Sequence, residues 1–437
     1  MKRTSFAALT TLAAAASFVP ACGSANDSDD GAEIESSSDL VIGDRLSGIS
    51  DADFAEAEDA FTEVEGVADG LGPIFNEAAC GNCHTQGAIG GAGEQIERRF
   101  GRFDNGRFNP LENKGGSLRQ LFANGPFVND QERSCPAVPL EVEPAEATVK
   151  NVGRLTTPLF GLGLVDTISD STLQNIAASE RGTTNGQVNM VTILLPDPRD
   201  PSQRLGGQRA GRFGWKAGVP NLVQFTADAY VNEMGITTDH CINGTRVLDF
   251  AGESKPNGVA VDPECEDGIP GLDDGIGECV AGQTTVQDDV ELFAKFMTFL
   301  APAPRGPGST TQGQILFTAA LCAGCHTTRT FRTPDKPFNG VPGNFSFRPF
   351  SDFLTHDMGA LGDRIGNPGD NEARTRRMRT APLWGIRFRS NLLHDGRATN
   401  IRDAVRAHDG DARTSVTLFN ALPSAQRNAL INYVNSL

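Results

Sequence analysis

Basic residues are few in this sequence: 38 Lys and Arg stand against 55 Asp and Glu, a formal net charge of −17. Nucleic-acid binding needs basic patches that neutralise phosphates, so this balance argues against such a partner. Alternation of polar and apolar residues, the pattern of a half-buried strand, is also scarce. We therefore predict a mainly α fold, with long loops because the chain contains 49 Gly and 25 Pro.

The N-terminal apolar run, FAALTTLAAAASFV, is too short and too rich in alanine to favour a retained membrane-spanning helix. It follows Lys2-Arg3 and leads into VPAC, which resembles a bacterial lipobox with Cys22 as the lipidated residue. We expect a lipoprotein-type signal peptide over residues 1–22, with ordinary signal-peptidase cleavage as the alternative. Residues 23–50, acidic and rich in serine, should form a disordered tether. The mature protein would lie in the periplasm or cell envelope, anchored through a lipid on Cys22.

Two Cys-x-x-Cys-His motifs, CGNCH at 80–84 and CAGCH at 322–326, are typical of c-type haem attachment. Cysteines three apart lie on one face of a helical turn and can bond both haem vinyl groups, and the adjacent His then reaches the iron. Zinc would need four ligands closing one site, and no second CxxC completes either motif. We predict two covalent haems c. Their attachment residues and proximal ligands are Cys80, Cys83, His84, Cys322, Cys325 and His326.

Four further cysteines suit disulfides in an oxidising compartment, and three connectivities are possible. Because Cys265 and Cys279 flank one acidic loop, we favour the pairs Cys265–Cys279 and Cys135–Cys241. The loop, residues 262–279, is rich in carboxylates, so calcium is a candidate ligand. Its spacing matches no EF-hand, and a solvated disulfide loop is the favoured interpretation.

The two haem motifs are followed by similar segments. RLTTPLFG at 154–161 follows the first and RTAPLWG at 379–385 follows the second. Helices predicted within 215–235 and 396–410 then occupy equivalent places in the two halves. This repeated order predicts two cytochrome c-like domains, each with one covalently bound haem.

A helix ending at the APAP sequence marks the predicted domain boundary, because proline breaks helices. We place an N-terminal haem domain at 51–301 and a C-terminal haem domain at 302–437. The boundary helix and the last helix of the chain each carry an apolar stripe, formed by Val290, Phe293, Met297 and Leu300 in the first and by Leu430, Val434 and Leu437 in the second.

From about residue 71 onward, the sequence resembles the bacterial di-haem cytochrome c peroxidase superfamily. It is most similar to the di-haem oxidoreductase branch, whose members are labelled peroxidase or thiol oxidoreductase. The matching stretches include GLGPIFNEAACGNCH, RLTTPLFGLGLVD, GRFGWKAGVPNLVQFTADAYVNEMGITT and LLHDGRATNIRDAVRAHDGDA. The resemblance implies one high-potential haem that receives electrons and one haem that reacts with peroxide. Members of the family often bind calcium between their domains.

The sixth ligand of the second haem is predicted from helical spacing. Ile401, Ala404, Val405 and His408 share one face, so that His408 would approach the iron. A histidine stabilised by the dipole at a helix C-terminus is the alternative interpretation. His356 and Met358 are the rival ligands, and His394 is expected near a haem propionate or in a turn.

The first half differs at the equivalent position. Aligning Asn221 with Asn400 places Ala229 where the second half has His408, which predicts an open distal side on the first haem. Glu233 lies one turn later, where a carboxylate could take a proton from bound peroxide and return it to the leaving oxygen. In the resembled peroxidases a Gln and a Glu line the peroxide pocket, and these match Gln224 and Glu233. Tyr230 and Met234 are alternative distal ligands.

Trp215 matches the aromatic residue that lies between the haems in the resembled family. It would relay electrons, or it is a core Trp with a satisfied N–H. We expect an exported di-haem c-type oxidoreductase that reduces hydrogen peroxide with electrons from a small c-type cytochrome or similar donor. Two alternatives stay open: a pure electron-transfer cytochrome, and an oxygenase or side-chain-modifying oxidase on the same scaffold.

Overall fold

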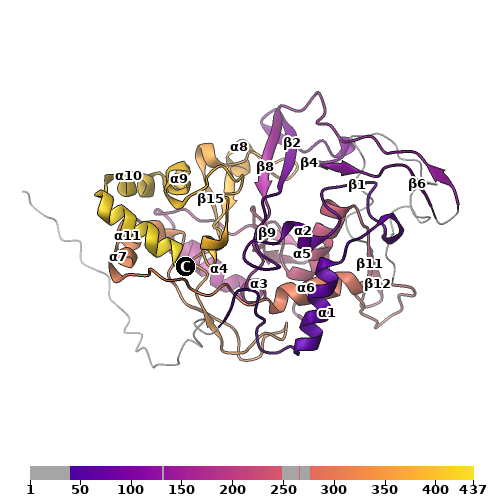
Figure 1. The fold of residues 1–437 in the computed structure, drawn as a ribbon, viewed down its shortest axis with the longest axis horizontal. Coiled ribbons are helices and arrows are strands. Elements are labelled where there is room, and N and C mark those ends of the chain that lie inside the picture. Colours follow the sequence, from indigo (N-terminus) through magenta and orange to yellow (C-terminus); the bar gives the residue numbers. More distant parts are fainter. Residues whose placement is uncertain (1–39, 130–131, 249–264, 266–275) are drawn as a thin grey trace, which may run out of the picture. The chain divides into compact units, whose positions relative to one another are not determined.

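Short helices and small sheets alternate along the chain in this computed structural model (Figure 1). The structure describes residues 40–129, 132–248, 265 and 276–437. Of these residues, 31% are helical and 17% are in strands. The strands form several two-stranded sheets and one four-stranded sheet. The prediction of a mainly α fold made of cytochrome c-like domains is therefore wrong.

The four-stranded sheet explains much of this error. It joins β2 (Ile96–Asp104), β3 (Arg107–Asn109), β4 (Leu118–Arg119) and β8 (Val149–Leu155). Strands β2 and β3 form a hairpin that turns at Asn105 and Gly106, with φ of 51° and 75°. Asn-Gly is the preferred pair for such a two-residue turn. Strand β2 lacks an apolar face because its residues Glu97 and Arg99 line a cavity instead of a hydrophobic core.

A first group of helices packs around α6 (Asp288–Phe299), with α1 (Asp51–Thr62), α3 (Leu162–Asp166) and α5 (Leu222–Ala229) beside it. The predicted stripe of α6 is confirmed, since Val290, Phe293 and Met297 are buried. Leu46, inside the tether predicted over residues 23–50, is buried and donates its N–H to the Phe299 carbonyl at 2.7 Å. Residues 23–39 lie outside the described residues, and the tether stays a prediction.

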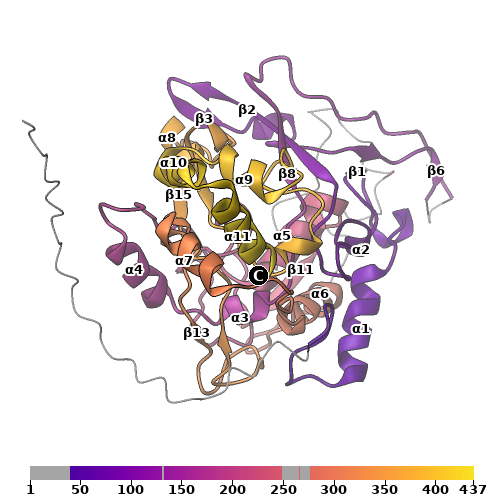
Figure 2. The same cartoon turned by 60° about the vertical axis from the view of Figure 1, so that its left-hand side comes forward.

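A second group of helices comprises α7 (Thr311–Ala319), α9 (Ile401–Ala407), α10 (Arg413–Ala421) and α11 (Ser424–Asn435) (Figure 2). The predicted stripe of the last helix is confirmed, because Leu430, Val434 and Leu437 are buried. The described residues all fall in one compact unit, and the boundary at residue 301 stays a prediction. The signal segment and Cys22 lie outside the described residues. In the described part of the chain, every helix is too short or too polar to cross a bilayer.

The remaining elements are short segments that line the cavities or tie loops together. They are α2 (Cys80–Cys83), α4 (Asp170–Ser179), α8 (Glu372–Thr375), β1 (Ile74–Phe75), β5 (Phe122–Ala123), β6 (Phe127–Val128), β7 (Ser134–Cys135), β9 (Met190–Thr192), β10 (Gln208–Ala210), β11 (Asp239–Ile242), β12 (Thr245–Leu248), β13 (Phe331–Arg332), β14 (Ser346–Phe347), β15 (Thr355–Asp357) and β16 (Arg377–Arg379).

Two disulfides, Cys135–Cys265 and Cys241–Cys279, are present, so the favoured pairing was wrong. Strand β11 accounts for the second bond. Its Cys241 exchanges two backbone hydrogen bonds of 2.7 Å with Thr285, which brings the chain just before Thr285 alongside β11. Pairing across this bridge, rather than closeness in sequence, selects the partner of Cys241.

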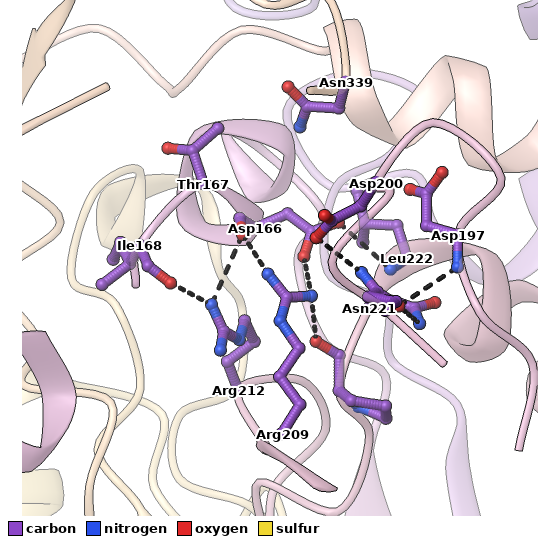
Figure 3. A network of polar contacts seen from close by, with 12 residues as sticks. Asp166, Thr167, Ile168, Asp197, Asp200, Arg209, Arg212, Asn221, Leu222 and Asn339 are labelled. Carbon is purple, nitrogen blue, oxygen red and sulfur yellow. Dashed lines mark hydrogen bonds and ion pairs between the residues drawn. The ribbon is translucent and has the colours of Figure 1, made fainter. Parts of the chain in front are cut away.

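A buried polar network holds the start of α5 (Figure 3). Asp166 accepts a hydrogen bond from Arg209 Nη1 at 2.8 Å and one from the Leu222 N–H at 3.4 Å. Arg209 also donates to the Pro220 carbonyl at 2.7 Å, and the fully buried Arg212 donates to the Ile168 carbonyl. Buried charges are stable only when paired, so this network fixes where α5 begins.

We expect Asp166→Ala to lower the free energy of unfolding by about 3–5 kcal/mol, because it leaves the buried guanidinium of Arg209 without its carboxylate. Denaturant unfolding of the purified protein measures the change. Asp104→Ala is the matched control, since Asp104 pairs with Arg102 on the exposed end of β2 and its loss should change stability little. Equal losses in both variants would contradict this role for the network.

Candidate functional site

Two cavities, of about 710 and 670 Å³, contain the two CxxCH motifs. The first is lined by Cys80, Cys83 and His84, on α2 and at its end. The second is lined by the equivalent residues Cys322, Cys325 and His326. Both volumes fall in the range of about 300–1,000 Å³ that small-molecule and cofactor sites occupy. The four motif cysteines are free of disulfides.

The two motif histidines are held in the same way. His84 Nδ1 lies 3.0 Å from the Gly91 carbonyl oxygen, and His326 Nδ1 lies 3.0 Å from the Phe350 carbonyl oxygen. This contact fixes the ring and leaves Nε2 as the metal-binding nitrogen. Burial lowers the pKa of each ring to about 4, so both are neutral, as metal ligands must be. These residues fit a covalently attached haem in each cavity.

His408 lines the second cavity with His326. It follows α9, which begins after the capping residue Asn400. Its Nδ1 lies 2.7 Å from the Ala404 carbonyl oxygen, so Nε2 is again the nitrogen left for a metal. The charge of His408 helps to lower the pKa of His326, after burial, so the two rings are near neighbours.

The rival ligands are placed differently. Both ring nitrogens of His356 are engaged, Nε2 with Asp352 at 2.9 Å and Nδ1 with the Thr184 carbonyl at 3.0 Å. It would have to break both contacts to bind iron. Met358 and His394 also line the second cavity, and Met358 stays a rival. His394 packs edge-on against Trp215 instead.

In the first cavity, α5 is the counterpart of α9. Asn221 caps α5 as Asn400 caps α9. In each case the asparagine side chain accepts a hydrogen bond from the backbone N–H three residues later. Ala229 lines the first cavity and offers no ligand atom. Tyr230 also lines it, but its hydroxyl donates to Glu65 at 3.3 Å and its ring packs edge-on against Phe293. Met234 is buried and lines the same cavity, so it stays an alternative ligand.

Beyond Ala229 the helix widens into a π-helical turn, Tyr230–Met234. Such turns are rare and often lie at functional sites. The backbone carbonyls of this turn accept hydrogen bonds from donors outside the helix. The Gln120 side chain donates to Asn232 at 2.6 Å, and the Asn76 N–H donates to Glu233 at 2.7 Å. The turn places Glu233 in the wall of the first cavity.

Glu233 shares the wall of the first cavity with a second carboxyl group, that of Glu97. Asn76 Nδ2 donates to Glu233 Oε2 at 2.7 Å. Burial, and then the charge of Glu97, raise the pKa of Glu233 to about 8. A group with this pKa can both accept and release a proton near neutral pH.

Gln224 lies in the first cavity wall, but its carbonyl oxygen is already used. It accepts the N–H groups of Leu194 and Leu195 at 2.9 and 3.2 Å. The amide NH₂ is the group left to donate to a ligand.

Trp215 lines both cavities. Its indole N–H donates to the Leu155 carbonyl at 2.8 Å, and the Arg389 guanidinium lies 6.0 Å above its ring. Arg389 lines the second cavity, and its Nε and Nη2 are buried without a hydrogen-bond partner. Unpaired buried donors of this kind need an anion, and the propionates of a haem would supply one.

Sequence reasoning missed several charged residues of these walls. The Asn-Gly hairpin signal could have placed Glu97 and Arg99 on one face of a strand. Arg154 lies within the RLTTPLFG motif, but its pairing opposite Glu97 depends on the sheet register. No local signal indicates Arg389. Most of the acidic loop considered for calcium, residues 262–279, lies outside the described residues.

Comparison with known proteins identifies one family. The model of the family described as "Di-haem oxidoreductase, putative peroxidase" matches residues 139–437, which include the second CxxCH motif, Trp215 and Glu233 but not the first motif. No curated protein matches. A solved structure of Kuenenia stuttgartiensis hydrazine synthase, pressurised with 20 bar xenon, is similar at 18% identity and a TM-score of 0.25. That alignment covers 36% of this chain and 58% of the other, and such weak similarity describes no shared fold.

We expect His408→Ala to convert one low-spin haem signal of the oxidised protein into a high-spin signal, because it removes an imidazole from the second cavity. Low-temperature EPR measures the change. His356→Gln is the matched control, and its spectrum should stay low-spin. If Met358→Leu changes the signal and His408→Ala does not, methionine is the ligand.

Proposed function

The chain belongs to the di-haem oxidoreductase family, and on this premise we propose that it reduces hydrogen peroxide to water. The observation that carries the proposal is the difference between the cavities. The second has His326 and His408 in its walls, whereas the first has His84 together with Ala229 and the carboxyl of Glu233. One cavity is thus suited to electron transfer and the other to an added ligand.

The reaction consumes two electrons and two protons for each peroxide and yields two water molecules. When bound, the haems supply iron that stores the electrons and binds the peroxide. The chain's own residues supply the rest. Trp215 extends from one cavity to the other and gives electrons an aromatic path, with its N–H satisfied so that it holds one orientation.

Glu233 carries the protons in this proposal. As a carboxylate it takes a proton from the first peroxide oxygen, and as an acid it returns that proton to the departing oxygen. Its pKa of about 8 gives both forms at neutral pH. The Gln224 amide NH₂ would donate a hydrogen bond to the bound peroxide. A pure electron-transfer protein has no need of such groups in a cavity without a second imidazole.

Export and covalent attachment belong to the same proposal. Two disulfides suit an oxidising compartment, which supports a periplasmic or cell-envelope location. Four unpaired cysteines in the cavity walls support covalent haem c. A lipid on Cys22 would anchor the protein, and a small c-type cytochrome or similar donor would supply electrons.

We expect Glu233→Gln to lower kcat/KM for hydrogen peroxide by about 10²–10⁴-fold, the usual contribution of a general acid–base group. Stopped-flow oxidation of the reduced protein by peroxide measures it. Glu77→Gln is the matched control because Glu77 lines the same cavity and bonds Asn82 and the Ala78 N–H. Unchanged turnover in Glu233→Gln would remove the proton-transfer role.

We also expect carbon monoxide to bind one of the two reduced haems, the one attached at His84. Ala229→His should abolish this binding, because it puts an imidazole where the second half has His408. The visible spectrum of the reduced protein under carbon monoxide measures both. If the unaltered protein binds none, it is a pure electron-transfer cytochrome.

A further inference from the structure

The two arginines of the second cavity wall lie at the end formed by Trp215. Arg389 holds its guanidinium 6.0 Å from the centre of the indole ring. Arg379 donates its backbone N–H to the Trp215 carbonyl at 2.8 Å and its Nε to the Gly214 carbonyl at 2.7 Å. Other parts of the wall are apolar and include Phe317, Leu383, Leu392, Val405 and Leu430. The cavity thus has an apolar body and a cationic end, which suits a largely apolar ligand with anionic groups on one edge.

Neither arginine is paired with a carboxylate in the part of the chain that the structure describes. Nε and Nη2 of Arg389 are buried with no hydrogen-bond partner. The guanidinium of Arg379, a buried residue, donates to the backbone carbonyls of Gly214 and Thr380. Burial lowers the pKa of both side chains to about 10, so both stay charged near neutral pH. A buried charge without a counter-charge is costly, so anions are needed to complete this end of the cavity.

Cations in the wall of the first cavity are neutralised by the chain itself. Arg99 pairs with Glu97 at 2.7 Å. Lys216 and Arg154 share the buried carboxylate of Asp363, at 2.9 and 2.7 Å. The second wall instead leaves its two buried guanidinium groups for a bound anion. This difference concerns the charge of the two walls and is independent of the exchange of His408 for Ala229.

We propose that Arg389 and Arg379 hold the propionates of the haem attached at His326 and raise its reduction potential, so that electrons enter the protein at the second cavity. A haem carries one propionate for each of the two guanidinium groups, and pairing of this kind is among the strongest hydrogen bonds that proteins make. The inference deepens the proposed peroxide reduction and rests on it, because it assigns the electron-entry role to one cavity.

The direction of the effect follows from the charges. Reduction adds one electron to the iron and lowers its positive charge by one. Propionates without partners would attract the more positive, oxidised iron, and guanidinium groups that neutralise them remove this preference. A histidine sixth ligand such as His408 gives a lower potential than methionine does. Arg389 and Arg379 offset that effect, which reconciles a histidine ligand with a role in accepting electrons.

The test is a redox titration of the haem-loaded protein followed by low-temperature EPR. The second haem is identified as the low-spin signal that its sixth-ligand variant, His408→Ala or Met358→Leu, removes. We expect Arg389→Gln to lower the equilibrium constant for one-electron reduction of this haem by about tenfold, which is about 59 mV, because a propionate loses its cation. Arg389→Lys keeps the charge and should retain most of the potential.

Arg387→Gln is the matched control. Arg387 lies two residues before Arg389, but its guanidinium packs 4.2 Å from the Phe388 ring and is not part of the second cavity wall. Its loss should leave the midpoint potential unchanged. If Arg389→Gln does not fold, Arg379→Gln removes the other cation and should also lower the midpoint. A guanidinium that only stacks on Trp215 would leave the midpoint in place when it is removed, and that result overturns the inference, as does an equal shift in the control.

Peroxide turnover by the unaltered protein separates this inference from the proposed function. If the midpoint falls in Arg389→Gln but the unaltered protein turns over no peroxide, the role of the arginines stands and the proposed function fails. If peroxide is reduced and the midpoint does not move, the inference alone fails.

Discussion

A hydrogen bond from imidazole Nδ1 to a backbone carbonyl is the interaction on which both cavities depend. His84 makes it with Gly91, His326 with Phe350 and His408 with Ala404. In each case the bond fixes the orientation of the ring and leaves Nε2 as the nitrogen that can bind a metal.

The asymmetry between the cavities arises from the end of one helix in each half. Asn221 and Asn400 cap the starts of α5 and α9 in the same way. The decisive position in each half is the eighth residue after this cap. In the second half the helix ends at that position and His408 faces the cavity. In the first half the position is Ala229, and the helix continues as a π-helical turn that carries Glu233 into the wall. The exchange of an imidazole for a methyl group, followed by one wide turn, leaves the first cavity with a carboxyl group in its wall and without a counterpart of His408.

Local signals predicted the parts of this arrangement that depend on nearby residues. The CxxCH motifs and the apolar stripe of α6 can both be read from spacing, and the structure bears out the stripe. The fold class and the disulfides could not be predicted from local signals, because they depend on pairing between distant strands. Strand β2 in particular lacks the sequence pattern of a strand. Its face turned to the cavity carries Glu97 and Arg99, where a core strand would carry apolar residues.

The charged residues of β2 also connect the wall of the first cavity to the region of Trp215. Arg154 reaches Glu97 across the sheet and Asp363 beyond it, and Asp363 in turn binds Lys216, the neighbour of Trp215. A continuous set of ion pairs therefore runs from Glu97 in the wall of the first cavity to Lys216, beside the Trp215 that lines both cavities. Charge added to either cavity must change the potential felt by this set, since buried ion pairs are weakly screened. In the proposed reaction, electron arrival by way of Trp215 and proton supply by Glu233 would therefore be electrostatically linked.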